Sequence, residues 1–429
     1  MKKKWTFFLF AILLLFISGC SNDAEATNAD GKIELDFWTF WGSETRRPII
    51  EKMIDDFNNS QDEIVVKHTY VPWGDIWTKN LAAVAAGNPP DVIVNDIRSV
   101  ALRAENNQVE DITDLMSDGL EEKFDPKLWE TVVHEDKTYA LPFNTDTRLL
   151  YYNKDAFREA GLDPEKPPRT WDELKEYAEK LNIKNGDTYE QVGFYPGWGD
   201  FGPISWMINA DDGVQLIDDG EVKINTPAKQ EALQWIVDFK EDLGEETVQN
   251  MSAEFGSEQQ NPFINGKVAM WIEPGTFFTQ LDQFAGDMDY GAALIPSFTE
   301  ETGNWSSGGG FVLEIPKGAK NPEASMKFIE YMTDVEAQTY WAENNFDNVA
   351  NIEASEKALD NLDGKAKEVY QKTLESLEET DFSTVPLEYP DYTDLVNPNI
   401  DDALQGDMSV EEALEKAQKD VEASKRETE

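Results

Sequence analysis

Residues 142–153 of the chain read Pro-Phe-Asn-Thr-Asp-Thr-Arg-Leu-Leu-Tyr-Tyr-Asn. A proline opens this stretch, small polar residues follow it, and the apolar run at 149–152 is typical of a β-strand. A helix is predicted to begin at Asp155 and to end before Gly161. Polar residues between two strand segments fit a chain that crosses from one lobe to another and exposes side chains in a cleft. An ordinary loop before a buried strand has the same local pattern, so the flanking sequence must distinguish the two.

The sequence before this stretch alternates between strand and helix patterns. Apolar residues alternate with acidic ones at 33–37, and residues 50–57 place apolar side chains on one face of a helix. A strand at 64–70, a helix at 76–86 and a short strand at 91–94 follow. This order predicts a doubly wound α/β fold with a parallel sheet, in which ligands lie at the carboxyl ends of the strands. The residues after the strands are therefore candidate ligand contacts: Trp41, Gly42, Trp73, Asn95 and Asp96.

The sequence after residue 153 has a different character. A capping box at 170–173 opens a helix that reaches about residue 181. Residues 193–202 are rich in aromatic side chains and glycine, a composition typical of a binding loop. The stretch 266–275 predicts a short strand that runs into a polar turn containing glycine. Helices are predicted near the end of the chain at 364–379, 392–404 and 409–425.

The N-terminus has the features of a targeting segment. Three lysines precede an apolar run at 5–17, which is too short to span a bilayer as a mature helix. Cys20 follows Ile-Ser-Gly and is the only cysteine of the chain, so an internal disulfide is impossible. Residues 1–19 then form a signal peptide and 20–31 a flexible polar tether. A plain signal peptide with a chance cysteine is the alternative.

The chain is strongly acidic along its whole length. It has 429 residues, enough for two lobes with their own cores, and 40% of them are apolar, as in a globular protein. The formal net charge is −48, and removal of residues 1–19 with their three lysines makes it −51. Such a surface repels nucleic acid and anionic lipid, so we expect no nucleic-acid partner. A solvated surface suited to saline or alkaline surroundings is our hypothesis for the acidic excess.

Catalytic and metal-binding motifs are sparse. The chain has two histidines, His68 and His134, and neither lies in a His-Glu-x-x-His motif. It has no Gly-x-Ser-x-Gly elbow and no phosphate loop. We therefore expect no metal, no cofactor and no catalytic residues, with both histidines structural or exposed. A secreted enzyme acting on glycans stays open as an alternative, because 85 Asp and Glu residues could include a glycosidase-like carboxylate pair.

Several short motifs occur together in one order. They include Ala-Gly-Asn-Pro-Pro-Asp-Val at 86–92, Pro-Arg-Thr-Trp-Asp-Glu-Leu at 168–174 and Asn-Gly-Lys-Val-Ala-Met at 265–270, followed by Gly308-Gly-Gly310 and Phe-Ile-Glu-Tyr-Met at 328–332. With the lipobox-like Cys20, the chain resembles the extracellular solute-binding proteins of carbohydrate ABC importers, the superfamily of the maltodextrin-binding protein. The resemblance covers about residues 32–425.

The resemblance implies a two-lobed fold of the periplasmic-binding-protein type (type II), with the solute bound in a cleft between α/β lobes. The crossings would fall near 142–147, 311–315 and 349–353. The first lobe would comprise 32–143 plus 314–350, and the second 146–311 plus 353–429. The implied function is capture of a sugar, with an oligosaccharide as the expected ligand, and its delivery to a membrane permease. A binding protein for a peptide or another polar solute stays open as an alternative.

The implied site combines aromatic rings, which stack on the apolar faces of sugars, with carboxylates and amides that bind hydroxyl groups. The candidate ligand contacts are Trp41, Gly42, Trp73, Asp96, Asn144, Asp146, Trp198, Glu273, Gly275, Trp305, Gly309, Tyr389 and Tyr392. The resemblance also implies lipidation of Cys20, which would anchor the protein outside the cytoplasm on the cell membrane, on the outer face in a Gram-positive cell. Permease subunits are the implied partners, and we expect the protein to be a monomer.

Overall fold

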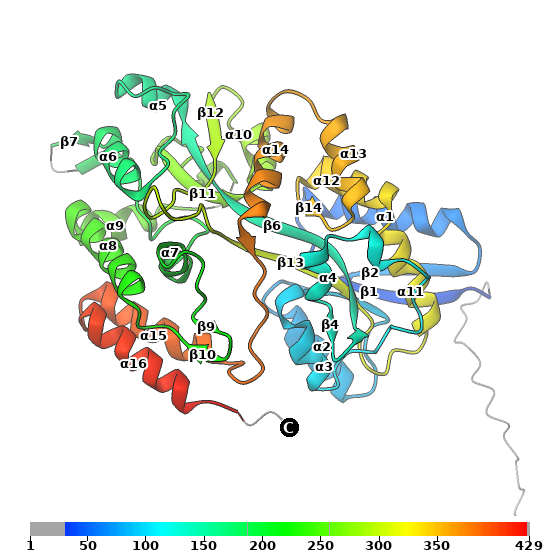
Figure 1. Ribbon diagram of the computed structural model, residues 1–429. Helices are drawn as coiled ribbons and strands as arrows, with labels where there is room; N and C mark the ends of the chain where they lie inside the picture. The colour runs from blue at the N-terminus through cyan, green and yellow to red at the C-terminus, as the bar shows by residue number, and fades with distance from the viewer. Residues whose placement is uncertain (1–30, 187, 257, 427–429) are drawn as a thin grey trace, which may run out of the picture.

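A computed structural model describes residues 31–186, 188–256 and 258–426. The predicted signal peptide, Cys20 and most of the tether lie outside the described residues. The described chain forms two lobes, each with its own large cluster of buried apolar side chains (Figure 1). The lobe on the right in Figure 1 is the first lobe and the lobe on the left is the second. Within the described residues, no helix is long and apolar enough to span a membrane.

One long strand joins the two lobes. β6 (Ala140–Asn153) runs without a break through residues 142–153. Its first half pairs with β13 (Ser306–Glu314), and its second half pairs with β11 (Met270–Pro274) and β12 (Tyr290–Ala293). The expectation of a polar connection between two strand segments is thus corrected to one continuous strand, in which β-branched threonines alternate with other polar residues. β6 and β13 are the two crossing strands in Figure 1.

The first lobe contains the predicted parallel sheet. β2, β1 and β3 lie side by side and parallel, which confirms the predicted α/β order. β13 lies antiparallel beside β3 and places Phe311 opposite Asp96. Because β13 arrives from the second lobe, the carboxyl end of β3 lies next to the crossing. The elements of this lobe are β1 (Ile33–Thr39), α1 (Arg46–Ser60), β2 (Ile64–Tyr70), α2 (Ile76–Ala85), β3 (Val92–Asp96), the 3-10 helix η1 (Ile97–Ser99), α3 (Val100–Glu105), the 3-10 helix η2 (Glu121–Lys123), α4 (Pro126–Glu130), β4 (Val133–His134), β5 (Lys137–Thr138), α11 (Pro322–Met332) and α12 (Val335–Asn345).

The second lobe packs helices around the far half of β6. Thr170 caps α6 by accepting a hydrogen bond from the Glu173 amide, and Ser409 forms the predicted capping box with Glu412 at α16. The elements are α5 (Lys154–Glu159), α6 (Trp171–Leu181), β7 (Ile183–Asn185), β8 (Thr188–Gln191), α7 (Pro203–Ala210), β9 (Ile217–Asp218), β10 (Glu221–Val222), α8 (Pro227–Leu243), α9 (Glu245–Ser252), the 3-10 helix η3 (Glu258–Gln260), α10 (Phe277–Phe284), α15 (Tyr392–Gln405) and α16 (Val410–Ala423).

The third connection between the lobes differs from the expected crossing at 349–353. After β14 (Asn348–Val349), helix α13 (Ile352–Asn361) buries Ala354 and Ala358 in the first lobe's core, so this lobe extends beyond residue 350. Helix α14 (Gly364–Glu378) contributes Val369 to one core and Tyr370 to the other. The chain therefore changes lobes along α14, whose C-terminal end leads into β15 (Thr380–Asp381) beside β13. Small alanines let α13 pack closely on α12, which keeps it in the first lobe.

Candidate functional site

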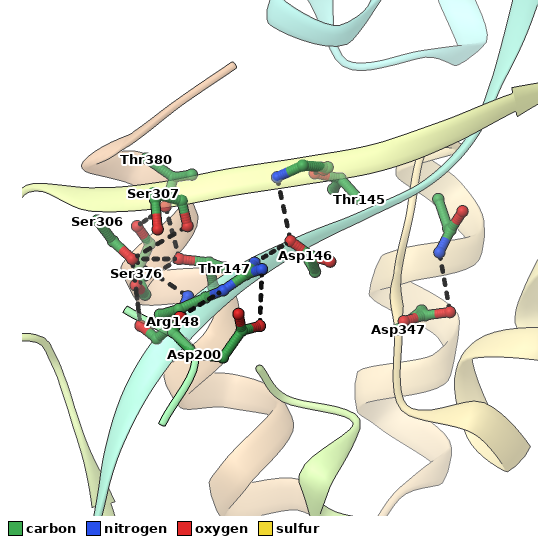
Figure 2. Close-up of polar contacts among 12 residues, drawn as sticks. Thr145, Asp146, Thr147, Arg148, Asp200, Ser306, Ser307, Asp347, Ser376 and Thr380 are labelled. Carbon is green, nitrogen blue, oxygen red and sulfur yellow. Dashed lines mark hydrogen bonds and ion pairs between the residues drawn. The ribbon is translucent and has the colours of Figure 1, made fainter. Parts of the chain in front are cut away.

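A guanidinium group lies between two carboxylates where β6 enters the second lobe (Figure 2). Arg148 Nη1 donates to Asp146 Oδ1, and Arg148 Nη2 forms an ion pair with Asp200 Oδ2 at 2.9 Å. Arg148 Nε also donates to the Asp200 carbonyl at 3.2 Å. The Gly309 amide donates to Asp146 Oδ1 at 3.0 Å. Both bonds that Asp146 accepts from these described residues use Oδ1. We call Asp146, Arg148 and Asp200 the charged array.

The neighbouring carboxylates keep Arg148 charged. Burial alone would lower the pKa of Arg148, but Asp146 and Asp200 outweigh burial and hold this pKa above its ordinary value. Glu273 on β11 also acts on Arg148. Burial raises the pKa of Glu273 to about 7, and Trp271 Nε1 donates to its Oε1 at 2.9 Å. The region where β6 enters the second lobe thus combines one fixed cation, Arg148, with several acidic side chains.

An aromatic cluster lies at the carboxyl ends of β1 and β2 in the first lobe. The ring of Trp73 is 52% exposed and makes edge-to-face contacts with Phe40, Trp77 and Phe311 at centroid distances of 4.6, 4.7 and 5.5 Å. Tyr70, at the end of β2, is another exposed aromatic residue. These rings present apolar surface that the first lobe does not bury.

The cluster and the array lie close together. Phe311 contacts Trp73, while Gly309, two residues earlier on β13, donates its amide to Asp146. Two residues of a strand span about 7 Å. Asp96 pairs with Phe311 across the sheet, so it belongs to the same region. Aromatic surface and acidic side chains therefore meet at the junction of the lobes.

The loop that carries Asp96 is held by a buried ion pair. Asp96 caps η1 by accepting from the Arg98 amide at 2.8 Å. Arg103 donates to the Asp96 carbonyl at 2.8 Å and forms a buried ion pair with Glu314 of β13. Asn95 Nδ2 donates to the same carboxylate at 2.7 Å. Asn95 is thus a supporting residue, while the Asp96 side chain stays partly exposed.

Asn144 serves the crossing rather than a ligand, which corrects the sequence-based expectation. Its side chain is 2% exposed, and its Nδ2 donates to Asp347 Oδ2 at 2.9 Å. Trp341 Nε1 donates to the same oxygen at 2.9 Å. Burial raises the pKa of Asp347 to about 6. Asn144 therefore ties β6 to the segment that leads into β14.

Two tryptophans expected at the site lie in the cores. Trp41 is 1% exposed and packs against Phe143 and Trp341, whereas its neighbour Phe40 joins the aromatic cluster. Phe40 contacts both Trp41 and Trp73, at centroid distances of 5.6 and 4.6 Å, so it lies between the core and the exposed cluster. Trp198 is 7% exposed, and its Nε1 donates to Ser252 Oγ at 2.8 Å.

The prediction of a binding loop at 193–202 also needs correction. Its rings Phe194, Tyr195 and Phe201 are buried in the second lobe's core. Its contribution to the junction is instead Asp200, whose side chain is 52% exposed. Aromatic composition predicted binding, but here it supplies core packing and positions one polar residue.

The remaining candidates are also used internally. Tyr70 covers Gly42, where an added Cβ would lie 2.3 Å from the tyrosine ring. Gly275 is buried against α14, and the carbonyl of Gly309 accepts from Thr145 Oγ1 at 2.8 Å. Both backbone polar groups of Gly309, a candidate ligand contact, are therefore bonded within the crossing.

Three aromatic candidates pack on the second lobe. Trp305 is partly buried beside Phe201 at a centroid distance of 6.3 Å. Tyr389 is buried in the core cluster, and burial raises the pKa of Tyr392, which packs against that cluster. Of the predicted residues, the structure brings together Trp73, Asp96, Asp146 and Glu273. Arg148, Asp200 and Phe311 were missed, although Arg148 follows Asp146 by two residues and so shares its side of the strand.

The histidines lie outside this region. Burial lowers the pKa of His68, whose Nε2 lies 2.7 Å from Thr39 Oγ1. His134 Nε2 lies 3.1 Å from Glu105 Oε1, and with Glu135 these residues form a group of metal-ligand type on the surface of the first lobe. Glu105 and Glu135 are exposed, and the group is best described as a surface hydrogen bond between His134 and Glu105 with a further acid nearby.

Comparisons with known proteins agree with this architecture. The structure superposes on that of CpMnBP1 with mannobiose bound at a TM-score of 0.80, with 25% identity over 90% of this chain and 99% of the other. The maltodextrin-binding protein MdxE of Bacillus subtilis is 26% identical over 83% of each chain. The sn-glycerol-3-phosphate-binding periplasmic protein UgpB of Pectobacterium atrosepticum is 24% identical over 74% of this chain and 73% of its own length.

The shared family is one of binding proteins, which agrees with the prediction that this chain is not an enzyme. The family model described as bacterial extracellular solute-binding protein matches residues 41–339, more than half of the chain. Together with the two lobes and the polar junction between them, this match shows that the chain belongs to the family of bacterial extracellular solute-binding proteins.

Proposed function

We propose that this protein captures an uncharged oligosaccharide between its two lobes and delivers it to the permease of an ABC importer. The observation that carries the proposal is the half-exposed Trp73 ring beside the charged array. A ring of this kind stacks on the C–H face of a sugar, while Asp146, Asp96 and Arg148 bind its hydroxyl groups. The ligand would bridge the lobes because these groups come from both.

Two of these relatives support a saccharide ligand, whereas the third is named for a charged glycerol ester. CpMnBP1 was solved with mannobiose and MdxE is named for maltodextrin, whereas UgpB is named for sn-glycerol 3-phosphate. A phosphate ester requires unpaired cationic or amide donors. The cation of the charged array is already paired with Asp146 and Asp200. The geometry therefore favours a neutral saccharide.

Ligand binding would close the lobes about the crossing strands, because a ligand that contacts both lobes binds the closed form more tightly than the open one. The closed surface would then dock on the permease. We also propose that Cys20 is lipidated and holds the protein on the outer face of the cell membrane. A single acyl chain binds membranes only weakly, so anchoring would require more than one chain.

A thermal-shift screen of the chain without its first 27 residues tests the proposal. The panel contains mannobiose, mannotriose, maltotriose, sn-glycerol 3-phosphate and short peptides. A saccharide at one hundred times its dissociation constant should stabilise the protein by about 2.7 kcal/mol. Stabilisation by peptides or glycerol phosphate without any response to saccharides would refute the ligand class. Hydrolysis of a saccharide by the purified protein would refute the binding role.

A further inference from the structure

Most N–H donors of the Arg148 guanidinium are already bonded to Asp146 and Asp200. It has five N–H donors, and three of them are used by Asp146 Oδ1, Asp200 Oδ2 and the Asp200 carbonyl. Its side chain is only 16% exposed, so it cannot swing freely toward a ligand. Its remaining donors suit the lone pairs of hydroxyl oxygens.

The array carries a net negative charge. Two carboxylates surround one guanidinium, and Glu273 adds a third acid that also acts on Arg148. The two carboxylates differ in their surroundings, because Asp146 is fixed by the Gly309 amide while Asp200 is half exposed at the end of a loop. Substitution of Asp200 should therefore change the charge of the array without disturbing the crossing strands.

From this arrangement we infer that Asp200 and Arg148 determine ligand selectivity: Asp200 occupies the guanidinium and makes the site reject anionic sugars while it accepts neutral ones. The inference rests on the proposed function and deepens it. A carboxylate or phosphate on the ligand would face Asp146 and Asp200 and would have to displace Asp200 from Arg148. A neutral sugar meets no such cost, since a hydroxyl group is able to donate to a carboxylate and to accept from Arg148.

The experiment compares Asp200→Asn with wild type in calorimetric titrations with mannobiose, maltotriose, digalacturonate and sn-glycerol 3-phosphate. The substitution keeps the backbone carbonyl bond to Arg148 Nε and removes one negative charge. The ratio of neutral to anionic affinity should fall about twofold to fivefold, as expected for loss of a partly exposed ion pair. Asp200→Glu, which restores the charge, should restore most of the ratio.

Asp155→Asn is the matched control. Asp155 pairs with Arg158 at 2.7 Å on α5, at the far end of β6, so this variant changes the net charge equally without altering the array. Equal ratios in the two asparagine variants would overturn the inference, as would wild-type protein that binds digalacturonate as tightly as the neutral sugars. Wild-type protein that binds no saccharide at all would instead refute the proposed function, and the selectivity inference would fall with it.

Discussion

Replacing Trp73 by alanine should weaken saccharide binding while leaving the protein folded. Trp73 is 52% exposed, so about half of its surface already contributes nothing to folding. Its other surface makes three edge contacts with Phe40, Trp77 and Phe311. A buried aromatic pair is worth about 0.5–1.5 kcal/mol beyond area burial, and these contacts are partly solvated. We therefore expect a loss of about 1–2 kcal/mol in the free energy of unfolding.

The effect on binding should be larger, because closure over a ligand would bury the free face of the ring. Removal of an anchoring aromatic residue usually costs about 1–3 kcal/mol of binding free energy, which is roughly a 5- to 150-fold increase in Kd. Calorimetric titration with the best saccharide of the thermal-shift panel measures Kd, and urea denaturation of the free protein measures stability.

Trp129→Ala is the matched control for this variant. Trp129 is also a partly buried tryptophan of the first lobe, stacked on Phe124 at a centroid distance of 5.6 Å, but it lies on α4 rather than at the strand ends. It should lose stability without losing affinity. If the Kd of Trp73→Ala stayed within twofold of wild type, or if both variants lost affinity equally, the assignment of Trp73 as a stacking residue would be wrong.

Two further predictions concern buried charges. Burial raises the pKa of Asp347 to about 6, so the folded protein binds this proton more tightly than the unfolded chain and loses stability as the pH rises from about 4 to 6. In Asp347→Asn that loss should be absent. Urea denaturation at pH 4 and pH 7 measures the change in the free energy of unfolding between the two pH values, and this change should differ by about 3 kcal/mol between the variant and wild type. Identical pH profiles of the two proteins would contradict the prediction. Arg103→Met should cost about 3–5 kcal/mol in urea denaturation because it leaves Glu314 buried and unpaired, and adding Glu314→Gln should recover much of that cost if the ion pair is responsible.

Much of the fold could be predicted from the sequence because local patterns agree with tertiary structure there. The strand periods at 33–37 and 64–70 and the cap at Ser409 each appear where expected. Trp73 was predicted as a ligand contact because it follows a strand and Asp146 because of the family resemblance, and the structure places both near the junction of the lobes.

The failures share a physical cause, which is that composition does not specify the direction of a side chain. Phe40 and Trp41 are adjacent in the segment after β1, yet Phe40 joins the aromatic cluster while Trp41 is buried in the core. Trp198 lies in a loop that is rich in aromatic residues, yet the second lobe's core covers it. Whether a ring in this loop is buried depends on helices such as α9, which are distant from the loop in sequence.

The polar character of β6 has a second explanation besides ligand binding. Thr147 Oγ1 lies within 2.6–3.1 Å of the hydroxyl groups of Ser306, Ser376 and Thr380, which come from β13, α14 and β15 (Figure 2). Asn144 is likewise bonded to Asp347. A buried polar group is costly unless it forms a hydrogen bond. The buried polar side chains of β6 therefore need polar partners on the neighbouring segments that also connect the lobes.

This double use follows from the alternation of side chains along the strand. Thr145 and Thr147 bond to the other connecting segments, whereas Asp146 and Arg148 form the charged array on the opposite side. The side chains that would bind a ligand thus alternate along β6 with those that form hydrogen bonds to the other connecting segments. Any rotation of the lobes about β6 would change both sets at once. A ligand that bonds to Asp146 could therefore act directly on the strand about which the lobes would move.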